Sequence, residues 1–132
     1  MATTIGYEYD TEAQVLGTAD GYVTLSGTTQ QFSSVIDCNG WLGFAVTVEV
    51  DFDGTPTDNV NVNLYRCRDA TPTNPDDVGQ VIAQLDKATD PNQRTFVIFG
   101  EARYNRIGVV QTGSTNSHDV RIYATKFRAV TA

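Results

Sequence analysis

A strict alternation of apolar and polar residues over residues 44–52 is the clearest structural signal in the chain. The even positions of this stretch carry five large apolar side chains, Phe44, Val46, Val48, Val50 and Phe52. The odd positions carry Ala45, Thr47, Glu49 and Asp51. Because successive side chains on a strand point to opposite faces, this spacing predicts a half-buried strand. Its apolar face requires a second layer to cover it.

The rest of the chain supplies further strands at short intervals. Strands are expected at residues 22–25, 30–38, 60–65, 95–99, 104–111 and 119–128. Residues 80–87 fit either one helical face or a strand, and the surrounding strands favour a strand. The proline-rich segment 69–77 and the segment 90–93 are predicted to be turns. Asn39-Gly40 is a typical hairpin turn, which predicts that the strands on either side of it pair.

This spacing predicts a single antiparallel β-sandwich or jelly roll of about seven to nine strands. Residues 1–20 are weakly patterned and are interpreted as an N-terminal arm or an edge strand, and residues 21–132 as the sandwich. No apolar run reaches the roughly 20 residues of a membrane-spanning helix. The first ten residues have neither a basic leader nor an apolar core, so no export signal is expected.

Charge is distributed unevenly along the chain. The net charge of −7 argues against a general nucleic-acid binder, which needs clustered Lys and Arg. Residues 1–65 contain nine acids and no base, and residues 66–132 contain nine bases and seven acids. The halves therefore carry −9 and +2. Either the two halves interleave and their charges mix, or the molecule has an acidic side and a basic side that suit a charged partner or further copies of itself.

Candidate catalytic residues are few. His118 is the single histidine and follows a loop of Gly, Ser, Thr and Asn, so a surface position is expected and no triad is indicated. Cys38 and Cys67 lack the spacing of a zinc site. Their strand parities place them on opposite faces, which predicts free thiols. No enzymatic activity and no cofactor are expected.

Two weaker binding signals remain. Asp51, Asp53 and Asp58 resemble the start of a calcium loop, but the glycine follows too early for the EF-hand pattern, which favours a turn with solvated carboxylates. Trp41 and the six tyrosines could form a platform on which sugars stack. A single Trp that opens a buried strand is more typical of a core residue.

Three stretches carry a family resemblance. Residues 58–65 read DNVNVNLY after a TPTD turn, residues 89–100 read TDPNQRTFVIFG and lead into ARYNRIGVV, and residues 112–126 read TGSTNSHDVRIYATK. In this order they resemble small β-sandwich accessory proteins of tailed-bacteriophage virions, which decorate capsids or sit on tails. The likeness begins at residue 58 and does not involve residues 1–40.

The resemblance implies a structural role. It points to a capsid decoration, or cement, protein of the virion that binds the major capsid protein or other virion subunits and bridges neighbours, without nucleic acid or membrane. A homo-oligomer is expected, with a trimer favoured. The acidic N-terminal segment is the expected contact region, through Tyr7, Glu8, Tyr9, Asp10 and Glu12. The alternative is a tail- or fibre-associated module that binds receptors or carbohydrate.

Overall fold

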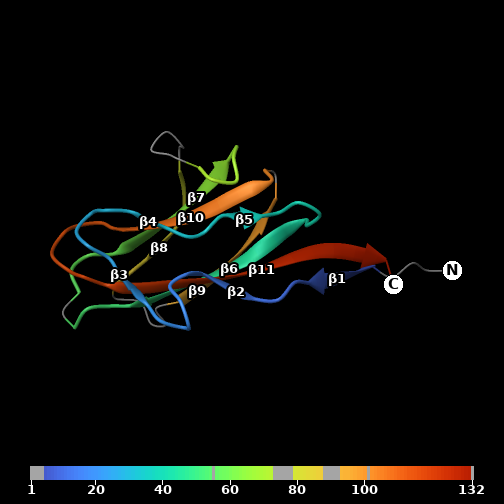
Figure 1. Ribbon diagram of the computed structural model, residues 1–132. Coiled ribbons are helices and arrows are strands. Elements are labelled where there is room, and N and C mark those ends of the chain that lie inside the picture. The colour runs from blue at the N-terminus through green and yellow to red at the C-terminus, as the bar shows by residue number, and fades with distance from the viewer. Residues whose placement is uncertain (1–4, 55, 73–78, 88–92, 101, 132) are drawn as a thin grey trace.

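The protein is a sandwich of two antiparallel β-sheets (Figure 1). The computed structural model describes residues 5–54, 56–72, 79–87, 93–100 and 102–131, and these residues form eleven strands and no helix. In this described part of the chain, no helix therefore has the length and apolarity needed to cross a membrane. The predicted all-β sandwich is confirmed. The predicted turns at 69–77 and 90–93 lie largely outside the described residues.

Sheet A is organised around the longest strand. Its strands follow the order β1 (Ile5–Tyr9), β11 (Asp119–Thr131), β6 (Gly43–Asp51) and β9 (Gln93–Phe99). Two short strands, β2 (Ala13–Leu16) and β3 (Val23–Thr24), also pair with β11. One side of β11 is thus occupied by β6 and the other by β3, β2 and β1 in succession.

Sheet B covers the apolar face of sheet A. Its strands follow the order β4 (Gln31–Phe32), β10 (Tyr104–Gln111), β7 (Val60–Cys67) and β8 (Gln80–Leu85), and β5 (Ile36–Asp37) also pairs with β10. The core lies between the sheets, where the alternating residues of β6 meet those of β7 and β10. Its fully buried apolar side chains include Leu25, Phe44, Val46, Val48, Val60, Val62, Ile107, Val109, Val120 and Ile122.

The structure corrects the expected hairpin at Asn39-Gly40. The predicted strand 30–38 is split into β4 and β5, and both pair with β10 in sheet B, whereas β6 lies in sheet A. The turn, with Gly40 at a φ of 81°, therefore carries the chain from one sheet to the other. This split, together with two strands in the N-terminal segment, raises the strand count above the expected seven to nine. Residues 80–85 are a strand, as favoured.

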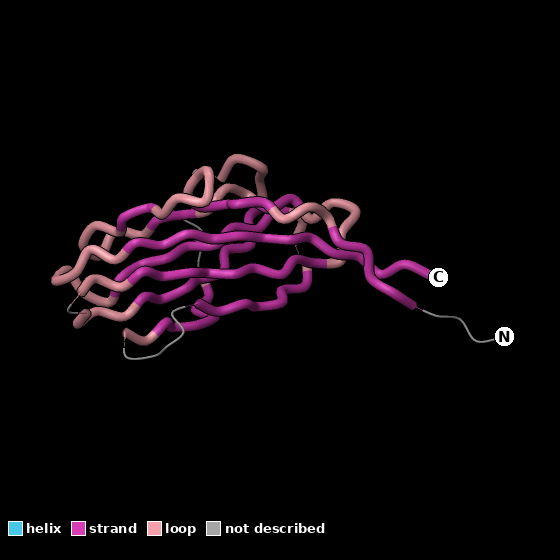
Figure 2. Tube along the Cα trace, turned by 90° about the horizontal axis from the view of Figure 1, so that it is seen from below, coloured by secondary structure: helices cyan, strands magenta, loops and turns pink. Residues whose placement is uncertain are grey.

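A two-stranded ribbon projects from one end of the sandwich. It consists of β1 and the end of β11, with Ile5 opposite Thr131 and Tyr9 opposite Phe127. Figure 2 shows this ribbon running past the other strands toward both chain ends. The N-terminal segment is therefore an edge of sheet A over its described residues, and its first strand extends beyond the second layer.

Both cysteines are free thiols, as their opposite strand parities predicted, and both side chains are buried, although parity placed only one of them toward the core. Burial raises the pKa of the Cys38 thiol, and a weak hydrogen bond from the Asn105 amide at 3.6 Å acts in the opposite direction. The Cys67 thiol lies 3.8 Å from the carbonyl oxygen of Tyr65.

A substitution at the centre of β6 tests the assignment of its faces. Val48 is fully buried, whereas Thr47 lies on the outer face, where its hydroxyl contacts that of Thr95 at 2.8 Å. Val48→Asp is expected to prevent folding, because an unpaired buried carboxylate costs several kcal/mol, comparable to the whole stability of a domain. Thr47→Asp is expected to cost far less. Equal shifts in the melting temperatures of the two variants would contradict the assignment.

Candidate functional site

An exposed apolar patch covers the outer face of sheet A at the ribbon end. Tyr7 and Tyr9 are 60% and 65% exposed, and Val97 and Phe99 are 61% and 56% exposed. Ala45 and Phe127 lie between these two pairs and form the floor of a shallow groove of about 330 Å³. We call these six residues the aromatic patch. Exposed large apolar side chains that cluster on one face are typical of binding surfaces, so this patch is the candidate functional site.

Strand register explains how these residues meet. Phe127 and Phe99 both pair with Gly43, so all three lie at one level of the sheet. A Cβ on Gly43 would collide with the carbonyl oxygen of Ile98, so a larger residue cannot be accommodated between these strands. The Phe127 ring packs edge-on against Tyr7 and against Phe99, each with a centroid distance of 6.0 Å. The rings thus form a connected set from β1 through β11 to β9.

An ion pair fixes β1 behind the patch. The Glu8 carboxylate accepts two hydrogen bonds from Arg128, both at 3.0 Å, on the face opposite Tyr7 and Tyr9. This arrangement lowers the pKa of Glu8 below its usual value of 4.5. Because the pair joins residues at matching positions of β1 and β11, it holds the ribbon together and sets which face of β1 the tyrosines occupy.

The other residues expected to contact partners occupy different surroundings. Asp10 lies 3.8 Å from the ammonium group of Lys126, and Glu12 is exposed between β1 and β2. Trp41 is half-buried, and the Arg128 guanidinium lies over its ring at 4.8 Å from the centroid. Trp41 is therefore neither a core residue nor an open stacking platform. Of the residues expected to contact partners, the structure brings only Tyr7 and Tyr9 into the aromatic patch.

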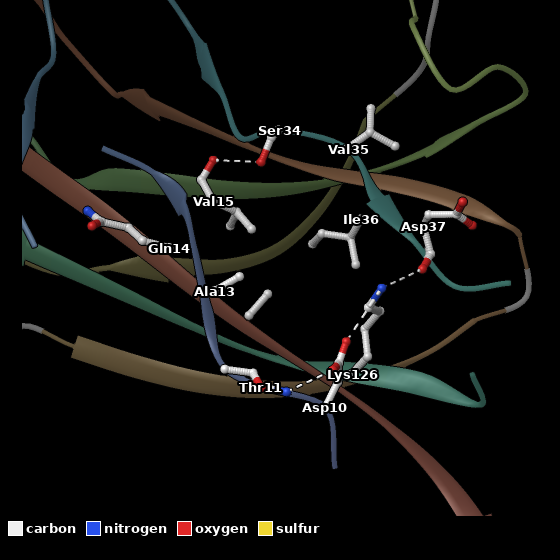
Figure 3. Close-up of a pocket in the computed structure, with 11 residues that line it drawn as sticks. Asp10, Thr11, Ala13, Gln14, Val15, Ser34, Val35, Ile36, Asp37 and Lys126 are labelled. Carbon is white, nitrogen blue, oxygen red and sulfur yellow. Dashed lines mark hydrogen bonds and ion pairs between the residues drawn. The ribbon is translucent and has the colours of Figure 1, made fainter. Parts of the chain in front are cut away.

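A second depression runs between the edges of the two sheets (Figure 3). It has a volume of about 300 Å³ and is bounded by residues 10–15, by residues 34–37 and by β11. At one end, the backbone N–H of Ser34 donates to the Val15 carbonyl oxygen at 2.8 Å. At the other end, Lys126 donates to the Asp37 carbonyl oxygen at 3.1 Å and faces Asp10. These contacts join the sheets, and the ammonium group is already engaged by this chain's own oxygens.

Buried polar side chains connect the loops at the opposite end of β11. We call Asp58, Gln111, Asn116 and His118 the loop clasp; all four are buried. The Asp58 carboxylate accepts hydrogen bonds from the backbone N–H groups of Thr115 and Asn116, both at 3.0 Å. The Asn116 amide oxygen in turn accepts one from the backbone N–H of Asp58 at 3.0 Å. The clasp therefore satisfies buried backbone groups that no strand pairs.

The expected surface position of His118 is wrong. Its side chain is fully buried and packs edge-on against Phe52. The backbone N–H of Asp53 donates to Nδ1 at 2.9 Å, so Nδ1 is an acceptor and Nε2 carries the proton that is donated to the Asp58 carbonyl oxygen at 2.8 Å. Both ring nitrogens thus bind backbone groups, and the histidine crosslinks two loops.

The three aspartates of the calcium-like loop have different environments. Asp51 is exposed, Asp58 is buried in the clasp, and Asp53 is exposed and held by the Asn116 amide and the Gly54 N–H, which lower its pKa. Within the described ranges, no group of three or more His, Cys, Asp or Glu is placed to hold a metal ion.

Sequence reasoning missed Val97, Phe99 and Phe127. A signal was available in residues 95–99, which are apolar on both parities, because a strand with two apolar faces needs a cover on each. Phe127 also breaks the parity of Val120, Ile122 and Ala124, which places it on the outer face.

Replacement of His118 tests the clasp. His118→Ala is expected to destabilise the fold by about 2–5 kcal/mol, because it leaves a cavity and removes the partners of two backbone groups, the buried Asp58 carbonyl and the part-buried Asp53 N–H. The neighbouring Ser117→Ala, at an exposed position, is the matched control and should lie within about 0.5 kcal/mol of the wild type. Urea unfolding measures both, and a wild-type value for His118→Ala would contradict the crosslinking role.

Acid is expected to loosen the ribbon. The pKa of Glu8 is lowered in the folded protein. The stabilisation by its ion pair is therefore fully present above pH 4.5 and is lost as the pH falls through the lowered pKa of the folded state. Hydrogen exchange of the β1 amides, corrected for intrinsic rates, should accelerate in this range. Glu8→Gln should show the faster exchange already at neutral pH and little further change. Identical pH profiles for the two proteins would refute the assignment.

Comparisons with known proteins place this chain in no family. No family model matches it, and no curated protein matches it either. Its chemistry is therefore inferred from the contacts described above. Among these surfaces, the aromatic patch is the one whose side chains are large, apolar and open to solvent. The polar groups of the second depression and of the loop clasp instead join parts of the same chain.

Proposed function

We propose that this chain is a non-enzymatic structural protein of a tailed-phage virion, a capsid decoration protein that binds the shell and bridges neighbouring subunits. The observation that carries this proposal is the aromatic patch, with four side chains more than half exposed on the outer face of sheet A. The resemblance of residues 58–132 to accessory virion proteins supports the assignment to a phage virion.

The patch has the composition of an interface centre. Tyrosine and phenylalanine are enriched where protein surfaces bind, because they bury much area and lose little conformational entropy. From the usual area of such side chains, the four exposed ones present on the order of 400 Å². A standard interface buries about 800 Å² per partner, so the patch can form the centre of one and needs a polar rim around it.

Oligomerisation fits this role. A decoration protein that meets a lattice symmetry axis gains from several identical contacts, because linked weak contacts bind far more tightly than each alone. We favour a homotrimer on the virion, with the major capsid protein or another virion subunit as partner. The acidic first half of the chain adds an electrostatic contribution to the binding of the partner, and salt would weaken that contribution.

A second candidate function is carbohydrate binding by a tail- or fibre-associated module. The exposed rings of Tyr7 and Tyr9 favour it, since open aromatic faces can stack on sugars. Trp41, the strongest candidate for stacking, has its ring covered by Arg128.

Binding to particles that lack the protein tests the proposal. Deletion of residues 1–12 is expected to leave the far-UV circular dichroism signal of the sandwich and to weaken attachment. Attachment of the full chain should itself loosen as salt rises, because its first half carries a charge of −9. Tyr7→Ala combined with Tyr9→Ala should weaken attachment at least tenfold, since interface tyrosines often contribute about 1 kcal/mol or more each. Tyr22→Ala, an exposed tyrosine outside the patch, is the matched control.

The outcomes separate the two functions. Particle binding that is lost with Tyr7 and Tyr9 but not with Tyr22 supports the decoration role. Undiminished binding by the truncated chain and by the double variant would overturn it. Binding to an array of glycans, abolished by the same double variant and without attachment to particles, would establish the second candidate.

A further inference from the structure

We propose that β1 of a second copy adds to the open edge of β9, so that copies of this chain join head to tail through sheet A. The biological role of this contact rests on the proposed function. The contact itself is inferred from the backbone groups, side chains and charges of the two strand edges.

The open edge of β9 presents its backbone and its apolar side chains at the same residues. The N–H of Gly100 donates to the carbonyl oxygen of Leu42 at 2.7 Å, so in this antiparallel pair the even-numbered residues of β9 bond to β6. The backbone groups of Thr95 and Val97 then point away from β6, to the side where no described strand lies. The side chains of Val97 and Phe99 face outward in the aromatic patch.

The edge of β1 has the same organisation. The N–H of Asp10 donates to the Lys126 carbonyl oxygen at 2.9 Å, so Glu8 and the other even-numbered residues bond to β11. The backbone groups of Tyr7 and Tyr9 point to the free side, and their side chains face outward. If the two edges pair, the tyrosines of one copy therefore lie beside Val97 and Phe99 of the next, on the same face of a continuous sheet.

Charge favours this pairing over the pairing of like edges. Residues 5–12 contain three acids and no base, and residues 93–100 contain one base, Arg94, and no acid. By strand parity, Glu8 and Asp10 lie on the same face of the joined sheet as Arg94. A second guanidinium, that of Arg66, lies at the β9 edge, where it donates to the Phe99 carbonyl oxygen at 3.4 Å. A two-fold contact between two β9 strands would bring no opposite charges together and would leave Tyr7 and Tyr9 uncovered.

Strand direction allows the contact to repeat. Each neighbour in the order β1-β11-β6-β9 is antiparallel, so β1 and β9 run in opposite directions and a second copy in the same orientation continues the antiparallel pattern. Such a head-to-tail contact is heterologous, and it closes into a ring when the rotation fits. The projection of β1 beyond the sandwich leaves it free to reach a neighbour (Figure 2). The trimer favoured above is such a ring.

Two matched valines test the surface. Val97 on β9 and Val81 on β8 are 61% and 62% exposed, and both lie on edge strands, but only Val97 belongs to the patch. Light scattering after size exclusion should show a closed oligomer for the wild type and for Val81→Lys, and a folded monomer for Val97→Lys. A monomeric wild type at micromolar concentration, or an oligomer that persists in a folded Val97→Lys, would overturn the proposal.

Crosslinking identifies the strands that meet. A Tyr7→Cys protein is mixed with a Val97→Cys protein and treated with a short thiol crosslinker, the native cysteines being buried. Crosslinks between the two variants are expected, and each variant alone should give none. Crosslinks of Val97→Cys to itself would establish a two-fold β9 contact instead, and the absence of all crosslinks would also overturn the proposal.

Failure here can be told apart from failure of the proposed function. If Val97→Lys is monomeric and still attaches to particles as tightly as the wild type, self-association occurs but is not needed for attachment. If the wild type forms the ring and no particle binds it, the decoration role fails and the edge contact stands. If the wild type is monomeric and binds particles through Tyr7 and Tyr9, the edge contact alone is wrong.

Discussion

The continuity of β11 is the constraint on which the rest of sheet A depends. Its thirteen residues pair with β6 on one side and with three separate strands on the other. A strand of this length cannot be covered by the second layer over its whole extent, so its last residues emerge as the ribbon. The same strand begins directly after His118, so one element links the loop clasp at one end to the aromatic patch at the other.

Sequence separation sets an order of formation along this strand. Pairing between β11 and β6 assembles the core, because Val46, Val48, Ile122 and Ala124 are buried together. Pairing between β1 and β11 joins residues from nearly the two ends of the described chain and buries little apolar surface. Since loop closure is unfavourable until contacts compensate for it, the ribbon is expected to form last and to open first. The region with the exposed aromatic residues is thus also the least firmly held part of the sheet.

The sequence was informative wherever one face of a strand is buried. The alternation in β6 and β7 predicted the sandwich and its core, because in a strand with alternating apolar residues only one face can be the buried one. The prediction from sequence was wrong at Asn39-Gly40, because a turn dipeptide determines a local chain reversal but not which sheet the next strand joins. It failed at His118 because a polar loop residue looks the same in sequence whether its partners are water or backbone. Tyr7 and Tyr9 could be proposed as contact residues from the N-terminal segment, but Val97 and Phe99 join them through strand order, which pairwise alternation does not reveal.

The ribbon has a practical consequence for handling the molecule. Ile5, where β1 begins, pairs with Thr131, where β11 ends, so both ends of the described chain lie at the tip of one ribbon, beside the aromatic rings. A label or fusion joined at either end of this ribbon therefore lies next to the same surface, and choosing the other strand does not avoid it. The loops at the far end of β11, around the exposed residues Ser114 and Thr115, are the position from which a probe could report without crowding that surface.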